Sequence, residues 1–421
     1  MLKNSNINIK KNSVQNVVII CILLLLGAIF FEFYIRLLTL DSATLTADDF
    51  RNHVNTALDF LNYIKYGKNA VSLFKENNQY SHIIAYPMWH IIVLVVTYFV
   101  GGTNGIENNV SINFSIAITN TALLLAAFII IFIYFSKKVN SFTAVLLATS
   151  MMFCGPIDNF GLFDRYYLGA YTANVWHNPT YLAAKPIALV AFLCYVKLLE
   201  DDNSDFKLYF KAAFLLVISA LCKPSFYQAF LPGLVAYCVI NFCVSRNASM
   251  FWRYVKIALT CVPVGILAII QSKIAVSGNG GAGLSFGPFY VIKHYTSNWL
   301  LAIFLSILFP VATFGLCLAK HRCNTEIKLS FYMLISAFLM YLLFYFDSNP
   351  FAGDFSWGVG LALNIAFVIA TKEIMLIRDK CWYGVKNGCF LLLAAHTFFG
   401  TIYFFNIWYS GLFLEKMSYF F

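Results

Sequence analysis

The stretch VVIICILLLLGAIFFEFYIRLL, residues 17–38, decides the class of fold to which this chain belongs. It carries only two charged side chains, Glu32 and Arg36, and a helix needs about 20 mostly apolar residues to cross a bilayer. The rest of the chain has the same character: 60% of its 421 residues are hydrophobic, 11% are charged, and the mean hydropathy is +0.73. This composition predicts an all-α, polytopic transmembrane helical bundle.

The apolar runs predict about twelve spans within one integral membrane domain, residues 1–421. The first run follows a lysine-bearing start, is too long for the core of a signal peptide and lacks a small-residue cleavage pattern, so we expect it to remain as an anchor. The expected spans are residues 17–38, 86–101, 112–135, 141–155, 178–198, 208–223, 226–245, 257–276, 299–319, 329–346, 356–376 and 388–410.

Lysine and arginine gather in short clusters between these spans, and the positive-inside rule places such loops in the cytoplasm. The rule predicts a cytoplasmic N-terminus and accounts for most of the net charge of +10, so that charge gives little support to nucleic-acid binding. The clusters are Lys3/Lys10/Lys11, Lys137/Lys138, Lys197/Lys207/Lys211, Arg246/Arg253/Lys256, Lys320/Arg322/Lys328 and Lys372/Arg378/Lys380/Lys386.

One part of this topology is inconsistent. The loop 39–85 and the pair Lys137/Lys138 lie two expected spans apart and should share a side, yet their charges argue for opposite sides. Either segment 86–101 is a half-crossing that dips into the bilayer and returns, or the lysine pair breaks the rule. The shortness of the segment favours the half-crossing.

The outer loop 39–85, expected to contain amphipathic helices, gathers ionisable residues in LTADDFRNHVNTALDF, residues 45–60. Asp48 and Asp49 suit the first turn of a helix, where acids are favoured. His53 follows Asp49 by four residues, so the two side chains share a helix face and the imidazole can orient or pair with the carboxylate, which makes His53 a catalytic candidate beside the two aspartates. A surface ion pair with no catalytic role is an equal alternative.

Polar and aromatic residues also gather in the other stretches expected on the outer face. Ionisable groups at membrane depth are costly unless they line a wet cavity or bind a ligand, and both Lys185 and Lys223 precede proline at an outer helix end. Snorkelling of these lysines to the interface is the alternative. The remaining candidates for binding are Arg165, His177 and His90, with Trp89, Trp176, Trp357 and Asp354 as residues that could contact a sugar.

Two kinds of site are disfavoured by spacing. The eleven cysteines lie mostly within apolar runs and form no Cys-x-x-Cys pair, which argues against a disulfide framework or a zinc site. The stretch GNGGAG, residues 278–283, has no following Lys-Ser/Thr and no preceding strand, so it is not a phosphate-binding P-loop.

The order TADDFRNH, then AYPMWHIIVLVVTYFVGG, then a span ending in IFIYFSKKVNSFTAVLLATSMMF resembles the amino-terminal module of GT-C type membrane glycosyltransferases. In that superfamily the first outer loop carries an acidic residue and juxtamembrane helices follow it. The later WHNPTYLAAKP, LCKPSF and GDFSW resemble motifs of multi-pass proteins of bacterial surface-polysaccharide synthesis. The chain lacks the large soluble carboxy-terminal domain of some members, and Asp-Asp stands where mannosyltransferase-like members have Asp-Glu.

The resemblance implies a multi-pass protein of the bacterial inner membrane that transfers a sugar from a polyprenyl phosphate or diphosphate donor to a surface glycan such as O-antigen or capsule. Asp49, or else Asp48, would act as general base on the acceptor hydroxyl. Lys185, Lys223 and Arg165 would stabilise the leaving phosphate, with His177 and His90 bonding the phosphate or orienting the base. The need for a divalent cation stays open.

Two other functions remain open at this stage. A repeat-unit polymerase of the Wzy type has a similar size and span count, although its outer loops rely on arginine more than those of this chain. A flippase or other transporter of lipid-linked oligosaccharides would place cations in a cavity open to both faces, whereas Lys185 and Lys223 map to one face.

Overall fold

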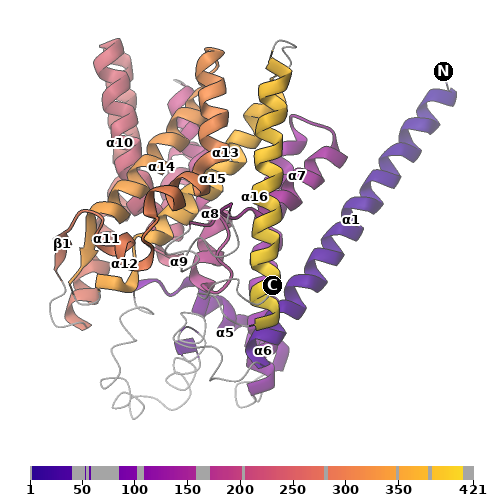
Figure 1. Cartoon of the computed structure of the whole chain (residues 1–421), viewed down its shortest axis with the longest axis horizontal. Helices are drawn as coiled ribbons and strands as arrows, with labels where there is room; N and C mark the ends of the chain where they lie inside the picture. The colour runs from indigo at the N-terminus through magenta and orange to yellow at the C-terminus, as the bar shows by residue number, and fades with distance from the viewer. Residues whose placement is uncertain are drawn as a thin grey trace.

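A computed structural model of the chain contains a helical bundle with almost no sheet (Figure 1). It describes residues 2–39, 53, 56–57, 85–101, 109–157, 171–201, 204–278, 283–347, 350–377 and 382–410. The expected amphipathic helices of loop 39–85 therefore lie outside the described residues, apart from three positions of that loop. Within the described ranges, the expectation of a polytopic helical membrane protein is confirmed.

Each of the twelve apolar segments expected from the sequence coincides with a helix. Nine helices in the described ranges are long and apolar enough to cross a membrane, whereas α5, α7 and α9 are shorter. The matching helices are α1 (Leu2–Thr39), α5 (Met88–Gly101), α6 (Asn109–Ser136), α7 (Ser141–Phe153), α8 (Pro179–Glu200), α9 (Phe206–Cys222), α10 (Ser225–Ser245), α11 (Ala248–Gly278), α13 (Trp299–Ala319), α14 (Thr325–Leu343), α15 (Ser356–Leu376) and α16 (Tyr383–Ser410).

Helices α1 and α6 are antiparallel neighbours. The rings of Phe31 and Phe114 lie 5.2 Å apart near one end of the pair, and Gly27 faces Leu125 farther along. Helix α1 therefore ends at Thr39 on the side where α6 begins, which we call the Thr39 side. It also follows that the lysine-bearing start of α1 and the pair Lys137/Lys138 after α6 share the opposite side.

Helix α5 is also antiparallel to α6, but it covers only part of its length. Trp89 near its start donates to Asn120 of α6, and Gly101 at its end lies against Ser111. Its 14 residues rise about 21 Å, less than the hydrocarbon thickness of about 30 Å. The helix thus runs from the interior of the bundle outward to the Thr39 side.

Helix α15 is the central element of the bundle. It packs against α14, α10 and α13, and 89% of the most apolar 18-residue stretch of the helix is buried inside the protein. The outer helices are different: α1 and α11 bury 22% of theirs, and α1 runs obliquely at the edge of the bundle (Figure 1). Only the helices at the rim therefore present broad apolar faces to the surroundings.

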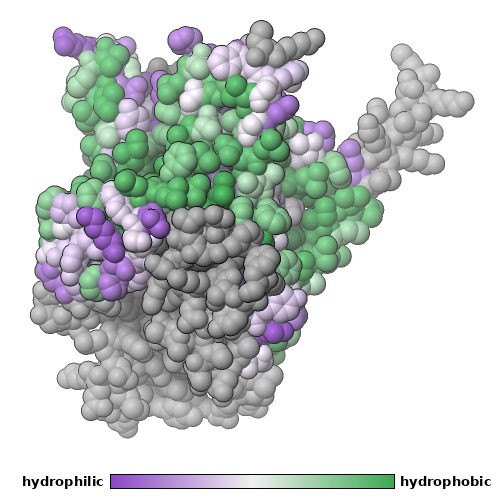
Figure 2. Space-filling model, in the orientation of Figure 1, coloured by the Kyte–Doolittle hydropathy of each residue, from purple (hydrophilic) through white to green (hydrophobic). Residues whose placement is uncertain are grey.

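A small feature with strands lies on the lower left of Figure 1. Strands β1 (Leu284–Phe286) and β2 (Phe344–Phe346) pair antiparallel, with α12 (Tyr290–Tyr295) after β1 and a short 3-10 turn (Pro350–Ala352) after β2. On the face drawn in Figure 2, hydrophilic residues gather at the upper helix ends and over this feature, and hydrophobic residues cover the region between them. This banding is typical of a membrane protein.

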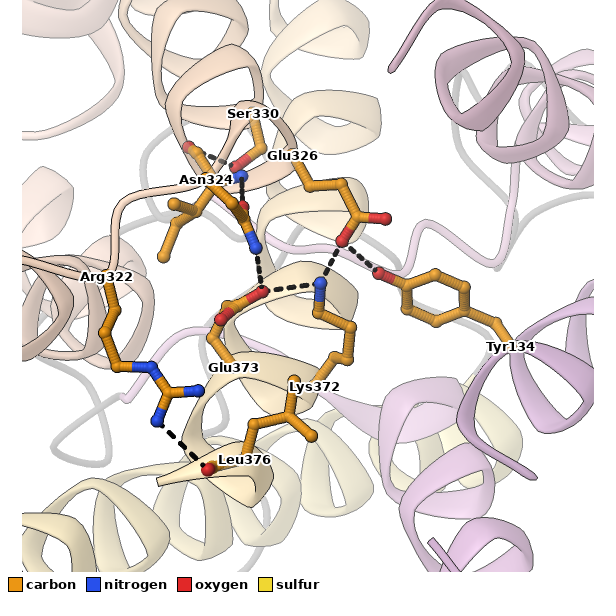
Figure 3. A network of polar contacts seen from close by, with 9 residues as sticks. Tyr134, Arg322, Asn324, Glu326, Ser330, Lys372, Glu373 and Leu376 are labelled. Carbon is orange, nitrogen blue, oxygen red and sulfur yellow. Dashed lines mark hydrogen bonds and ion pairs between the residues drawn. The ribbon is translucent and has the colours of Figure 1, made fainter. Parts of the chain in front are cut away.

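A buried charged cluster joins three helices at the side opposite Thr39 (Figure 3). Lys372 of α15 forms ion pairs with Glu326 of α14 and, at 2.5 Å, with its neighbour Glu373. Tyr134 of α6 donates to Glu326 over 2.9 Å, and Asn324 donates to Glu373 over 2.6 Å. One ammonium thus serves two carboxylates, that of Glu373, which is buried, and that of Glu326, which is partly buried.

We expect Lys372→Met to lower the free energy of unfolding by roughly 3–5 kcal/mol, because it leaves the buried Glu373 and the partly buried Glu326 without their cation. Thermal unfolding of the detergent-purified protein measures the change. Neutralising the carboxylates in the triple variant Lys372→Met/Glu326→Gln/Glu373→Gln should restore most of the loss. Lys138→Met, an exposed lysine on the same side, is the control, and an equal loss in that variant would contradict the argument.

Candidate functional site

Residues 171–178 form a buried, irregular segment between the region after α7 and the start of α8. Side chains of three helices hold its backbone: Ser306 of α13 accepts from the amide of residue 171, Tyr181 of α8 donates to the carbonyl of residue 173, and Tyr34 of α1 donates to that of residue 176. These helices are membrane-spanning candidates. Non-helical backbone at such depth is tolerated where protein surrounds it, and it commonly marks a binding region in membrane proteins.

Asn174 anchors the middle of this segment. Its side-chain Nδ2 donates to the carbonyl oxygens of Met151 (3.0 Å) and Cys154 (2.8 Å), and its Oδ1 accepts from Lys185 Nζ. Lys185 is thus bonded to a neutral amide.

The segment ends at Asn178, which caps α8. Its Oδ1 accepts from the amide of Tyr181 (2.8 Å) and the hydroxyl of Thr180 (2.7 Å), and Pro179 occupies the first helical position, where its missing N–H costs nothing. The same Oδ1 also accepts from Lys223 Nζ at 3.3 Å. The cap of one helix therefore holds the lysine of another.

Lys223 lies at the turn between α9 and α10 and is 5% exposed. Its ammonium lies 4.4 Å from the centroid of the Trp357 ring and 5.7 Å from that of Tyr86, and it donates to Thr180 at 3.3 Å. Cation–π contacts stabilise a buried ammonium without neutralising it. The imidazole of His177 lies 5.7 Å from Trp357 and completes this group, which we call the Lys223 cluster.

Two glycines bring the start of α15 against the Lys223 cluster. A Cβ at Gly360 would lie 3.1 Å from the Tyr181 hydroxyl oxygen and 3.2 Å from the carbonyl oxygen of Thr172, and one at Gly358 would lie 3.2 Å from the carbonyl of Ser225. These separations are tighter than ordinary van der Waals contact. The glycines therefore let α15 approach both the segment 171–178 and the start of α10, and this places the Trp357 ring over Lys223.

Two histidines meet at the start of α5, His90 of that helix and His53 of the loop 39–85. His90 is fully buried, and its Nε2 lies 3.2 Å from Nδ1 of His53, which is 8% exposed. Only one proton can lie between two nitrogens at this distance, so one of them presents a lone pair to the other. The Tyr86 ring lies 6.2 Å from that of His53, and this tyrosine joins the histidine pair to the Lys223 cluster.

The structure thus brings together five of the residues expected from the sequence. Lys223, His177 and Trp357 form one group, and His53 and His90 form an adjoining one. Asp48, Asp49 and Arg165 lie outside the described residues.

Three residues predicted to contact a sugar, Trp176, Trp89 and Asp354, are not part of the Lys223 cluster. Trp176 is 1% exposed and is surrounded by the rings of Phe30, Phe33, Phe153 and Phe404, so in this structure its ring packs against other side chains. Trp89 is fully buried, with its indole N–H on Asn120. Asp354 is exposed and lines a shallow hollow beside β2.

Sequence reasoning missed Asn174, Asn178 and Tyr86. The signal for Asn178 was present, because Asn before Pro at the start of an apolar run is a typical helix cap. Asn174 and Tyr86 had no comparable signal, since their partners Lys185 and Lys223 lie 11 and 137 residues away along the chain.

The Lys223 cluster has a chemistry that can bind an anionic group. No cluster of three or more His, Cys, Asp or Glu side chains that could hold a metal occurs in the described ranges. The Lys223 cluster instead combines a buried cation, hydroxyl and amide groups, and aromatic rings. No protein-family model matches the chain, and no curated protein matches it either.

We expect Gly360→Val to lower stability by about 1–3 kcal/mol, because the added side chain overlaps Tyr181 and the carbonyl of Thr172. It should also move Trp357 off Lys223, which a change in intrinsic tryptophan fluorescence would report. Gly315→Val in α13, where a Cβ meets nothing within 4 Å, is the matched control. Equal effects of the two substitutions would show that close packing at Gly360 is unimportant.

Proposed function

We propose that the chain is a membrane glycosyltransferase that takes a sugar from a polyprenyl phosphate or diphosphate donor and transfers it to a surface glycan on the outer face of a bacterial inner membrane. The Lys223 cluster is the observation that carries this proposal. It is a buried cation at the end of membrane helices, where the head group of a lipid-linked donor would lie.

The chemistry of the Lys223 cluster supports phosphate binding. Among the described residues, its ammonium contacts the Asn178 amide oxygen, the Thr180 hydroxyl and two aromatic rings. An ammonium beside amide and hydroxyl groups is suited to binding a phosphate. As the bond to the anomeric carbon breaks, the growing charge on the phosphate would be stabilised by this ammonium in an environment of low dielectric constant.

The histidine pair lies next to this group and supports a role in orienting the base. The acceptor hydroxyl must lose a proton as it attacks the sugar, and His53 is held in place by its contact with His90. In the proposal Asp49, or else Asp48, is the base, and His53, four residues after Asp49, orients it. The proposal assigns no cofactor and leaves a divalent cation as a possibility to be measured.

We propose a topology with a cytoplasmic N-terminus and eleven crossings, in which α5 only dips into the bilayer. The shorter α7 begins a crossing that the segment 171–178 completes on the Thr39 side, where α8 begins. Antiparallel α1 and α6 need an even number of crossings between them, and α5 alone would supply one. Contacts of Phe33 with Phe404 and of Arg36 with Tyr409 run in parallel along α1 and α16, so both helices end on the same side, as an odd total requires.

A repeat-unit polymerase of the Wzy type would use the same phosphate chemistry, and the glycan product separates it from a single-sugar transferase. A strain that lacks the polymerase makes a surface glycan with one repeat unit. A strain that lacks the transferase makes full-length chains without one sugar. A strain that lacks a flippase would instead accumulate lipid-linked intermediates on the cytoplasmic face.

We expect Lys223→Ala to reduce formation of the glycan by about tenfold to a hundredfold, because a hydrogen bond to a charged group contributes roughly 1.5–3 kcal/mol. Glycans of a deletion strain complemented with each variant, resolved on gels and by mass spectrometry, measure the effect. Lys293→Ala, an exposed lysine of α12, is the control. A stably inserted Lys223→Ala protein with full activity would refute phosphate binding by Lys223.

We expect either Asp49→Asn or Asp48→Asn to abolish transfer, because the amide is a far weaker base than the carboxylate. The same complementation assay measures it, with the amount of each variant in the membrane determined in parallel. Full restoration by both variants would mean that these carboxylates only favour a helix start. A transporter would then be better supported than a glycosyltransferase.

A further inference from the structure

Lys185 and Lys223 have different surroundings, although the sequence suggested one role for both. Lys223 contacts the cap of α8 and two aromatic rings, whereas Lys185 lies further along α8 and bonds to Asn174 beneath the segment 171–178. We infer that Lys185 is a positioning residue that fixes this segment through Asn174 and does not touch the phosphate. The inference deepens the proposed function and rests on it.

Asn174 forms hydrogen bonds with α7, with Thr172 and with Lys185. Both donated contacts of its Nδ2 go to carbonyl oxygens at the end of α7, and its backbone N–H goes to the hydroxyl of Thr172 at 3.1 Å. Lys185 supplies the hydrogen bond to Oδ1. The amide therefore links α7, α8 and the segment, and the link to α8 is the hydrogen bond from Lys185.

Lys185 is enclosed by protein. Lys185 and Asn174 are each 3% exposed, and Cys154 beside them is 1% exposed. Phosphate would need to displace Asn174 to reach the amine, and this would release the segment that holds His177 and Asn178. The contacts thus require a hydrogen-bond donor at position 185, and they do not require a positive charge.

Asn174 is close in sequence to His177 and Asn178. Asn174 precedes His177 by three residues and Asn178 by four, and Asn178 binds Lys223 through its Oδ1. A shift of the segment at Asn174 therefore changes the position of the Asn178 cap and of the His177 ring over Trp357. Through this connection Lys185 affects the Lys223 cluster without contacting it.

Three substitutions separate a donor from a charge at position 185. Lys185→Gln keeps an N–H donor without the charge, Lys185→Met keeps the approximate length with neither, and Lys185→Arg keeps the charge but adds volume and a planar head. The purified proteins are compared by thermal unfolding, and by the shift of the unfolding temperature on adding undecaprenyl phosphate as the probe. Complementation of the glycan measures activity in parallel.

Positioning predicts that Lys185→Gln retains the unfolding temperature, the response to the probe and most of the glycan. It predicts that Lys185→Met and Lys185→Arg each lower the unfolding temperature by several degrees and weaken the response to the probe at least about tenfold. Asn174→Leu should act like Lys185→Met, and the double variant should be no worse than either single one, because both remove one hydrogen bond.

The reverse order, with Lys185→Arg active and Lys185→Gln inactive, would overturn the inference and make Lys185 a phosphate ligand. Additive losses in the double variant would also overturn it. If the wild-type protein itself fails to respond to undecaprenyl phosphate and does not change the glycan, the proposed function fails. The order of unfolding temperatures among the three variants still decides the role of Lys185 in that case.

Discussion

Polar backbone inside an apolar bundle must find its hydrogen bonds within the protein, and the segment 171–178 meets this constraint with side chains. Water is not available in the hydrocarbon region, so an unpaired N–H or C=O there costs several kcal/mol. Tyr34, Tyr181 and Ser306 reach the segment from three helices, and Asn174 ties it to α7. The position of each of these helices is thereby coupled to the shape of one irregular stretch.

Helix α15 belongs to the Lys223 cluster at its start and to the buried charged cluster at its end. At its start, Gly358 and Gly360 remove the side chains that would separate it from α8 and α10, and Trp357 reaches Lys223. At its end, Lys372 and Glu373 form the buried charged cluster with α14 and α6. A helix buried on nearly all sides is thus fixed at one end by close packing and at the other by charge.

Among the described residues, the two buried lysines on the Thr39 side contact amide, hydroxyl and ring groups, whereas Lys372 contacts carboxylates. The ion pairs of Lys372 join two helices and serve the structure of the bundle. Lys223 lies beside the cap of α8 and two aromatic rings, where the proposal places a phosphate.

Local composition and length determined the helices: each apolar run predicted from the sequence is a helix, because about 20 apolar residues have one stable conformation in a bilayer. The sequence also indicated Lys223, His177 and Trp357, since ionisable and aromatic residues at helix ends are uncommon without a reason. It did not separate Lys185 from Lys223, and it did not show that Trp176 is enclosed by four phenylalanines. Those distinctions depend on residues up to 228 positions away in sequence, such as Phe404 against Trp176. Only the packing of the helices decides such contacts, because it sets which groups surround each buried side chain.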